Sequence, residues 1–492
     1  MTAEIPENVV YSIADVRAID QHTIDSGVAS FELMKRAAHF ALVTALSEFP
    51  RAKHWVVLCG SGKNAGDGYM LANLAVAIGR QVDALYVTPP DQLSGDARRG
   101  YEEAVKAGVT VTRFDGDLHE NADLIVDALL GSGLNRAIDG DFAAAAAAIS
   151  LHPAPCLSLD IPTGIDGDSG IKLGIAVQAD ATTTFVGRKT GLYFNDGPAH
   201  AGQIFYSDLG VPAAAFESRR PVLEFLREYL TQEALPPRQV QSHKGDFGHV
   251  LVVGGGPGMP GAARLAAEAA LRAGAGSVSV ATHPDNAAVI PASRPELMCY
   301  GVAADDISAL IANATVVALG PGLGKSEWAR KVFAAARKAD VPMVVDADGL
   351  NLLAEKPDVN PCRVITPHPG EAGRLLGCNA TTVQRDRLNA LYALQKKFGG
   401  CAVLKGHCSL ISRQSEPVLM CTDGNPGMAT AGMGDVLTGI IAGLLAQGLP
   451  PDSAASVAVH VHASAADAAA TFGERGMLAS DVLEEIRPWV NP

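Results

Sequence analysis

Short apolar segments of strand length alternate with segments of helix length along most of the chain. This alternation predicts a parallel sheet covered by helices on both faces, so we expect an α/β fold. The 492 residues are enough for two or more domains with cores of their own. The segments expected to form strands are 54–59, 81–87, 123–129, 156–159, 277–281, 315–319, 343–345, 363–365 and 401–404.

The alternation lapses at 212–245, where prolines accumulate. Pro212, Pro221 and the pair Pro236-Pro237 fall in this segment. Proline clusters between regular elements are typical of linkers. We therefore expect two domains, 1–224 and 225–492, the first built on a Rossmann-like three-layer parallel sheet.

The net charge, the cysteines and the apolar segments indicate which partners and which compartment to expect. The chain has 39 Lys and Arg against 53 Asp and Glu, a net charge of −14, so we do not expect it to bind nucleic acid. The 8 cysteines form no Cys-x-x-Cys pair, and several lie in apolar segments, as in proteins of a reducing compartment. No segment reaches the ~18 apolar residues of a membrane span, and the N-terminus lacks an apolar signal core. We expect a cytoplasmic protein that does not contact a membrane.

A glycine-rich segment, Asn425 to Gly439, leads into an apolar segment of helical length. A glycine turn that opens a helix leaves backbone N–H groups free and directs the positive end of the helix dipole at an anion, which suits a phosphate. The carboxylate of Asp435 would be repelled by a phosphate at this place, so its presence there indicates a function. The simplest function is that of a base that takes a proton from a hydroxyl. Taken alone, the pattern fits equally an ordinary helix start with an acid in its first turn.

Two further glycine-rich segments follow strands of the first half. Gly60–Gly68 leads to a helix expected from Tyr69, a nucleotide-binding layout whose spacing is neither that of dinucleotide-binding folds nor that of a Walker loop. Asp127 precedes the second segment, Gly131–Ala137, and Asp160 follows the next strand. Polar residues at strand ends predict a crevice there.

Polar residues also follow successive strands of the second half. Each segment alone fits an ordinary loop, and a lone His368 is more often a structural histidine than a ligand. Together they favour an active-site crevice at the carboxyl edge of one sheet. The segments are Gly320–Gly324, Asp346–Gly349, Thr366–Glu371, Lys405–Ser409 and Gly434-Asp435.

These segments resemble a known pair of enzyme domains. The second half resembles ADP-dependent NAD(P)H-hydrate dehydratases, which have a ribokinase-like α/β fold, and the first half resembles NAD(P)H-hydrate epimerases. As a whole the chain is similar to bifunctional NAD(P)H-hydrate repair enzymes. The segments that carry the resemblance are 242–248, 260–263, 320–323, 366–371 and 425–439 for the dehydratase, and 60–68, 127–137 and 160–164 for the epimerase.

The resemblance implies two reactions on nicotinamide cofactors that have added water at C6. The first domain would interconvert the R and S hydrates of NADH and NADPH. The second would dehydrate the S hydrate at the expense of ADP, with Mg²⁺, and release AMP and phosphate. Phosphorylation turns the C6 hydroxyl into a good leaving group, and Asp435 would accept the hydroxyl proton. The first domain would also hold K⁺.

The resemblance also implies the site residues. In the dehydratase they are Ala262, Gly322, His368 and Asp435 for the hydrate, and Lys405, Gly406, His407, Cys408, Ser409 and Gly434 for the nucleotide. In the epimerase the hydrate residues are Lys63, Asn64, Ala65, Gly66, Asp67, Gly131, Ser132, Gly133, Leu134, Asn135, Arg136, Ala137 and Asp160.

Asp160 is the expected proton shuttle of the epimerase and should have a pKa nearer neutrality. The implied K⁺ ligands are Asn64, Asp127 and Thr163, hard oxygen donors, and Asp127 is expected to stay ionised. Thr163 stands where Ser is commoner in the family.

The first domain departs from the family pattern at two positions. Lys63 replaces Asn and would either pair with a substrate phosphate or crowd the cation. Ala65 replaces Gly and would restrict the backbone if that position needs a positive φ. The alternative function is a ribokinase-like small-molecule kinase with a non-catalytic, dimerising first domain. In either case we expect a homo-oligomer.

Overall fold

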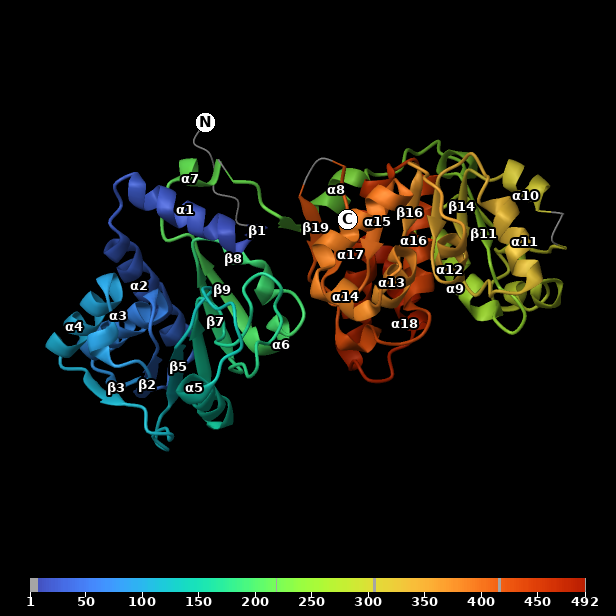
Figure 1. Ribbon diagram of the computed structural model, residues 1–492. Coiled ribbons are helices and arrows are strands. Elements are labelled where there is room, and N and C mark those ends of the chain that lie inside the picture. The colour runs from blue at the N-terminus through green and yellow to red at the C-terminus, as the bar shows by residue number, and fades with distance from the viewer. Residues whose placement is uncertain (1–7, 218, 304–306, 415–416, 492) are drawn as a thin grey trace. The chain divides into compact units, whose positions relative to one another are not determined.

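The computed structural model describes residues 8–217, 219–303, 307–414 and 417–491. The chain forms two compact units, Met1–Leu223 and Glu224–Pro492 (Figure 1). Both are α/β units with parallel sheets, as predicted. Among the residues described, no helix combines the length and apolar character needed to cross a bilayer.

The first unit contains a seven-stranded sheet in the order β4-β3-β2-β5-β6-β7-β9, with all neighbours parallel. Its strands are β2 (His54–Cys59), β3 (Gln81–Tyr86), β4 (Thr110–Arg113), β5 (Leu124–Ala128), β6 (Cys156–Leu159), β7 (Ala181–Phe185) and β9 (Gln203–Ser207), and β1 (Val9–Tyr11) pairs separately with β8 (Arg188–Lys189). Its helices are α1 (Ile13–Asp25), α2 (Ser30–Glu48), α3 (Lys63–Ala77), α4 (Gly95–Lys106), α5 (Gly140–Leu151), α6 (Gly197–Ala201) and α7 (Ala213–Glu217).

Successive residues of β2 pack on opposite faces of this sheet. Trp55 and Val57 belong to the core on the side of α2 and α3, and Val56 and Leu58 to the core on the side of α5. Burial on both faces explains why the strand is apolar without interruption. The strand order reverses between β2 and β5, and a ligand crevice is expected outside the carboxyl ends of the strands at such a point.

The second unit contains strands in the order β13-β12-β11-β14-β15-β16-β17-β18-β19, which are parallel as far as β17 and antiparallel from there to β19. Their bounds are β11 (His249–Val253), β12 (Ser277–Thr282), β13 (Met298–Gly301), β14 (Val316–Leu319), β15 (Met343–Val345), β16 (Arg363–Ile365), β17 (Cys401–Leu404), β18 (Ser409–Ile411) and β19 (Val418–Cys421), and β10 (Leu223–Phe225) spans the division between the units. The helices are α8 (Tyr229–Ala234), α9 (Pro260–Arg272), α10 (Ser308–Ala312), α11 (Glu327–Ala336), α12 (Asp348–Glu355), α13 (Pro369–Leu376), α14 (Ala380–Arg385), α15 (Arg387–Phe398), α16 (Met433–Ala446), α17 (Pro451–Ala469) and α18 (Ala479–Trp489).

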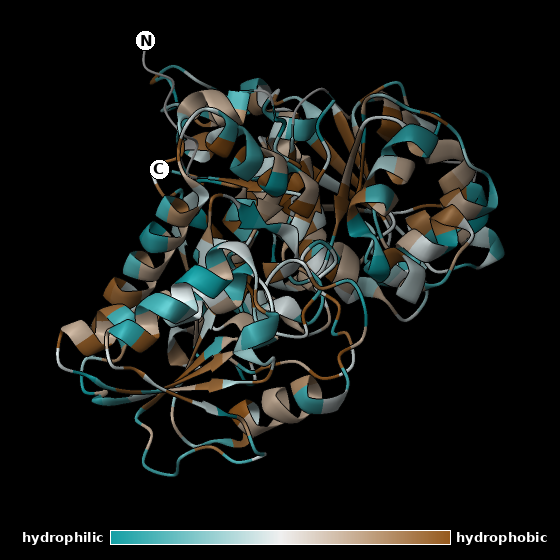
Figure 2. Ribbon diagram, turned by 60° about the vertical axis from the view of Figure 1, so that its left-hand side comes forward, coloured by the Kyte–Doolittle hydropathy of each residue, from teal (hydrophilic) through white to brown (hydrophobic). Residues whose placement is uncertain are grey.

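Helix α16 is central to the core of the second unit and packs closely on α9. A Cβ at Gly439 would lie 2.1 Å from the Ala266 carbonyl oxygen, and one at Gly443 would lie 2.6 Å from that of Ala270. The two glycines therefore let the helix backbones approach. The strands are mainly hydrophobic, whereas many helices carry both hydrophilic and hydrophobic residues (Figure 2). The packing of α16 on α9 fixes where the N-terminus of α16 lies.

All the strands predicted from sequence are present, but one helix boundary was wrong. The helix expected from Tyr69 begins at Lys63, so most of the glycine-rich segment forms the first turns of α3. Gly66 is buried in that helix, where a Cβ would lie 2.4 Å from the Met34 methyl group and 3.0 Å from Ala97 Cα. The glycine there serves close helix packing rather than a loop.

Candidate active sites

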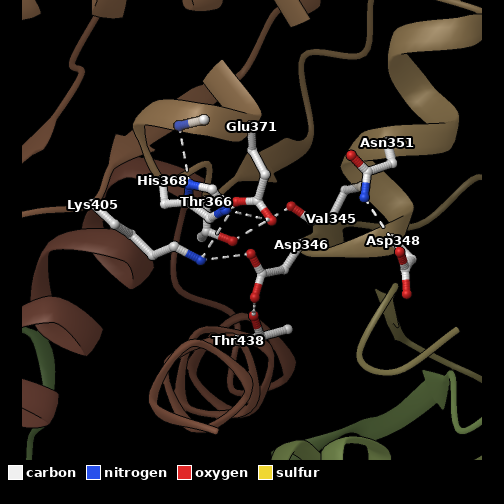
Figure 3. A network of polar contacts seen from close by, with 10 residues as sticks. Val345, Asp346, Asp348, Asn351, Thr366, His368, Glu371, Lys405 and Thr438 are labelled. Atoms are coloured by element: carbon white, nitrogen blue, oxygen red, sulfur yellow. Dashed lines mark hydrogen bonds and ion pairs between the residues drawn. The ribbon is translucent and has the colours of Figure 1, made fainter. Parts of the chain in front are cut away.

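The carboxyl ends of neighbouring strands β15, β16 and β17 bring charged residues of the second unit together (Figure 3). Lys405, after β17, places its Nζ 2.8 Å from Oδ1 of Asp346 and 4.0 Å from Oε2 of Glu371. Thr438 of α16 donates a hydrogen bond of 2.9 Å to the other oxygen of Asp346. Asp346, Glu371 and Thr438 were not assigned roles from sequence, although the first two lie in the segments that predicted the crevice.

The N-terminus of α16 lies against this charge cluster. Gly432 caps the helix with a φ of 95°, a left-handed conformation that favours glycine. A Cβ at Gly434 would lie 3.1 Å from Nζ of Lys405 and 3.3 Å from Oδ2 of Asp346. A side chain at position 434 would therefore crowd Lys405 and Asp346, and glycine leaves room for both beside the helix end.

Asp435 is half-buried in the first turn of α16. Burial raises the pKa of Asp435 to about 7, repulsion from Asp346 adds to this effect, and attraction to Lys405 opposes it. A carboxyl group with a pKa near neutrality can accept and return a proton efficiently at neutral pH. The side chain proposed as the base is therefore poised for proton transfer.

His368 caps α13 and also presents its ring to solvent. Its Nδ1 accepts a hydrogen bond of 3.0 Å from the backbone N–H of Gly370, and its own backbone N–H donates to Glu371. The imidazole is 52% exposed, and burial of the remainder, with repulsion from Lys405, lowers its pKa. Because Nδ1 accepts a bond, the neutral ring carries its proton on Nε2, where it can be donated to a ligand.

The two remaining residues expected at the hydrate site lie next to each other. Gly322 has a φ of 58°, and a Cβ there would lie 3.0 Å from the Cβ of Ala262, at the start of α9. A side chain at 322 would therefore strain the backbone and crowd α9. The structure brings together this pair, which sequence analysis predicted from separate motifs.

Arg387 supports the loop expected to bind the nucleotide, Lys405–Ser409, through hydrogen bonds to its backbone. The buried guanidinium of Arg387 donates to the carbonyl oxygens of His407 at 2.6 Å and Cys408 at 3.0 Å. The Cys408 side chain is itself buried, so only its backbone can contact a nucleotide. Sequence analysis missed Arg387, because nothing in the sequence indicated that α15 supports this loop.

A cavity of about 800 Å³ lies in the first unit, at the edge where both glycine-rich segments end. Of the residues predicted for the hydrate, Ala65 and Gly66 do not line it, because they face the interior of the unit as part of α3. The predicted residues that do line it are Lys63, Asn64, Asp67, Gly131, Ser132, Gly133, Leu134, Asn135, Arg136, Ala137 and Asp160.

Asp160 lies in this cavity with an unexpected partner. Its Oδ1 lies 2.5 Å from Nζ of Lys189, which is 1% exposed, and its Oδ2 accepts from the backbone N–H of Ser132 at 2.9 Å. Burial alone would raise the pKa of Asp160, but Lys189 outweighs it and holds the pKa below its usual value. The expectation of a pKa nearer neutrality was therefore wrong.

Of the residues expected to hold K⁺, Asn64 lines the cavity, whereas Asp127 and Thr163 are buried and do not line it. Asp127 accepts hydrogen bonds from Oγ1 of Thr163 at 2.7 Å and from Ser158 at 2.9 Å. Burial raises the pKa of Asp127, and the hydrogen bonds from Thr163 and Ser158 oppose that rise. Both the oxygen and the nitrogen of the buried Asn64 amide lack a hydrogen-bond partner among the described residues. A buried carbonyl oxygen without a donor fits a hard cation.

The two departures in the first glycine-rich segment do not disturb this arrangement. Lys63 is 68% exposed and pairs with Asp20 at 2.9 Å, at the rim of the cavity. Ala65 lies within α3 and has no positive φ, so that position does not need glycine. Lys63 is thus directed at Asp20, and Ala65 is buried within the helix.

Two family models match this chain, one in each unit. A family model described as NAD(P)H-hydrate dehydratase matches residues 250–488, and one described as YjeF-related protein N-terminus matches residues 30–191. A solved structure from Enterococcus faecalis, described as a ribokinase-like superfamily protein, is 28% identical, covers 55% of this chain and 95% of its own, and has a TM-score of 0.50. It shows the ribokinase-like fold of the second unit.

Curated relatives cover nearly the whole chain. The bifunctional NAD(P)H-hydrate repair enzyme Nnr of Coxiella burnetii is 44% identical over 98% of this chain and 100% of its own length. The enzyme of the same name from Escherichia coli is 41% identical over 99% of this chain and 95% of its own length. These relatives match both domains of the chain over nearly its whole length. The chain therefore belongs to the family of bifunctional NAD(P)H-hydrate repair enzymes.

Proposed function

We propose that this chain repairs hydrated NADH and NADPH by two reactions in two separate sites. The first unit interconverts the R and S hydrates, and the second dehydrates the S hydrate with ADP as phosphoryl donor, releasing AMP and phosphate. The observation that carries the proposal is Asp435 at the N-terminus of α16, beside the cluster of Lys405 with Asp346 and Glu371.

In the dehydratase site, Asp435 takes the proton of the C6 hydroxyl as its oxygen attacks the terminal phosphate of ADP. The free N–H groups of α16 at Gly434 and the ammonium of Lys405 face the charge on the phosphoryl group in transfer. The C6–O bond then breaks with the help of the N1 electron pair, and inorganic phosphate leaves. Loss of the C5 proton to water then restores the C5–C6 double bond of the dihydropyridine ring. His368, Ala262 and Gly322 bind the hydrate.

The loop Lys405–Ser409 binds the nucleotide mainly through its backbone. Mg²⁺ is held in proteins by one or two carboxylates together with substrate phosphates, and Asp346 and Glu371 are the carboxylates nearest to Lys405. Mg²⁺ would neutralise phosphate charge when it enters with ADP. The preference for ADP over ATP is part of this proposal.

In the epimerase site, Asp160 exchanges a proton with the hydrate in the cavity of the first unit. Asn64, Asp127 and Thr163 would hold K⁺, whose positive charge supports a substrate phosphate beside two carboxylates. The unpartnered amide of Asn64 is the observation that favours a cation there. A homo-oligomeric, cytoplasmic enzyme is also part of the proposal.

One coupled assay tests the proposal. Purified S and R hydrates are supplied with ADP or ATP, with and without K⁺, and the absorbance of the dihydronicotinamide is followed. Restored absorbance from the S hydrate with ADP, and from the R hydrate only while the first unit is active, is the expected result. A lasting phosphorylated product without restored absorbance would show a kinase instead.

A further inference from the structure

Two carboxyl groups share the cavity of the first unit, but their surroundings differ. Both oxygens of Asp160 accept hydrogen bonds, one from Lys189 and one from the backbone of Ser132. Asp67 lines the same cavity and makes no hydrogen bond or ion pair with any residue that the structure describes. One acid is therefore held in place, and the other is free to meet a ligand.

The ammonium group of Lys189 has no N–H donor left for a substrate. All three of its N–H donors are used, by Asp160 at 2.5 Å, by Oγ1 of Thr184 at 2.8 Å and by the carbonyl oxygen of Phe185 at 2.9 Å. Asp160 has a φ of 68°, which is costly for a residue other than glycine. The lysine thus fixes the direction of a carboxylate whose backbone is already strained.

The surroundings of the two acids shift their pKa values in opposite directions. Burial raises the pKa of Asp67 well above its usual value and the charge of Asp160 adds to this, while Lys63 opposes it. Asp20 acts in the same direction as Asp160, and Lys189 in the opposite one. Lys189 holds the pKa of Asp160 below its usual value. Two titratable groups whose pKa values are shifted in opposite directions are typical of an acid and a base in one active site.

We propose that Asp67 and Asp160 are the acid and the base of the epimerase and that Lys189 is the positioning residue that assigns these roles. This inference rests on the proposed function. Asp160 takes the proton of the C6 hydroxyl, the bond between C6 and N1 breaks with its electron pair going to N1, and Asp67 donates its proton to N1. The open-chain aldehyde rotates about the C5–C6 bond.

Ring closure then reverses each transfer on the other face of C6. N1 attacks the aldehyde carbon and returns its proton to Asp67, while the oxygen regains its proton from Asp160. Atoms and electrons balance without an oxidant, reductant or further reactant. The product is the opposite epimer, and both carboxyl groups regain their starting protonation states.

The test is the pH dependence of the conversion of purified R hydrate to S hydrate, measured by chromatography with the full chain at constant K⁺. The parent rate should fall only on the basic side, as Asp67 loses its proton. Asp67→Asn should lower kcat by about 10²–10⁴-fold and remove the basic fall. Lys189→Met should introduce an acidic fall, because Asp160 loses the cation that lowers its pKa against the effect of burial. Lys189→Arg should restore the parent profile.

Two controls keep these outcomes interpretable. Asp141→Asn removes an exposed acid of the same unit, paired with Arg113 at 3.3 Å, and should leave the profile unchanged. ADP-dependent dehydration of S hydrate and thermal unfolding report whether each variant is folded. If Lys189→Met does not fold, the pH profile of Lys189→Arg is the test of the role of Lys189. An acidic fall in the rate of that variant overturns this role.

The result that overturns the acid–base pair is distinct from the failure of the proposed function. If the parent protein does not interconvert the hydrates, the proposed function of the first unit is wrong. If the parent interconverts them while Asp67→Asn keeps the parent rate and the basic fall, the function stands and Asp67 is not the acid.

Discussion

Asp435→Asn removes the proposed base of the dehydratase while keeping the size of the side chain. Loss of a general base lowers a rate by about 10²–10⁴-fold, equivalent to about 3–5 kcal/mol of activation free energy. Burial first, and then the neighbouring carboxylates, raise the pKa of Asp435 to about 7. The ionised fraction in the parent should therefore rise from about 0.1 at pH 6 to about 0.9 at pH 8, and kcat/KM for dehydration should rise about tenfold with it.

The same substitution should stabilise the second unit at alkaline pH. A carboxyl group whose pKa is higher in the folded than in the unfolded state contributes stability below its unfolded pKa, and that stability is lost as pH rises through the folded value. For Asp435 the interval runs from about 4 to about 7, and the largest possible loss is about 4 kcal/mol. Asparagine does not ionise, so the variant should retain this stability at pH 8.

The assay combines dehydration of S hydrate by ADP with thermal unfolding at pH 5 and pH 8. Glu484→Gln, at an exposed position of α18, is the matched control and should change neither property. Activity above one tenth of the parent rate would show that Asp435 is not the base. Equal unfolding temperatures of parent and Asp435→Asn at pH 8 would refute the reasoning about its buried charge.

Four further changes test other parts of the two sites. His368→Ala should raise the KM for the hydrate more than that for ADP, and equal effects on both would indicate a purely structural histidine. Gly434→Ala should lower the dehydration kcat at least about tenfold, because its Cβ would lie 3.1 Å from Nζ of Lys405; an unchanged kcat contradicts the need for glycine. Asn64→Ala should abolish the K⁺ dependence of epimerisation and leave dehydration intact, as parallel titrations with KCl would show. Arg387→Lys should raise the KM for ADP without changing that for the hydrate, as steady-state kinetics would show.

Most continuously apolar strands were predicted from sequence, although the apolar strand β19 was missed, and a polar strand such as β7 was harder to recognise. Strand β7 reads Ala-Thr-Thr-Thr-Phe and was missed, although all five residues are buried. Its hydroxyl groups are satisfied within the fold, for example by the bond of 2.6 Å from Oγ1 of Thr182 to the carbonyl oxygen of Ala201. Buried threonines paired in this way resemble a surface segment in sequence.

The positions of the sites could be predicted because their glycines and acids follow strands, whereas the charge partners could not. Lysine is rarely buried, so nothing in the sequence marked Lys189 as the partner of Asp160. That single pairing reverses the expected pKa shift of Asp160. Likewise, the lack of room for a side chain at Gly434 beside Lys405 depends on how α16 packs, which no local pattern specifies.

The most direct test of two sites with two tasks is the consumption of an equilibrated mixture of R and S hydrates with ADP and K⁺. The parent protein should convert the whole mixture to the reduced cofactor. Asp160→Asn should consume the S part quickly and leave the R part, apart from slow spontaneous epimerisation. Asp435→Asn should restore almost no absorbance while still converting purified R hydrate to S hydrate. Consumption of the R part by Asp160→Asn as fast as by the parent would contradict this account.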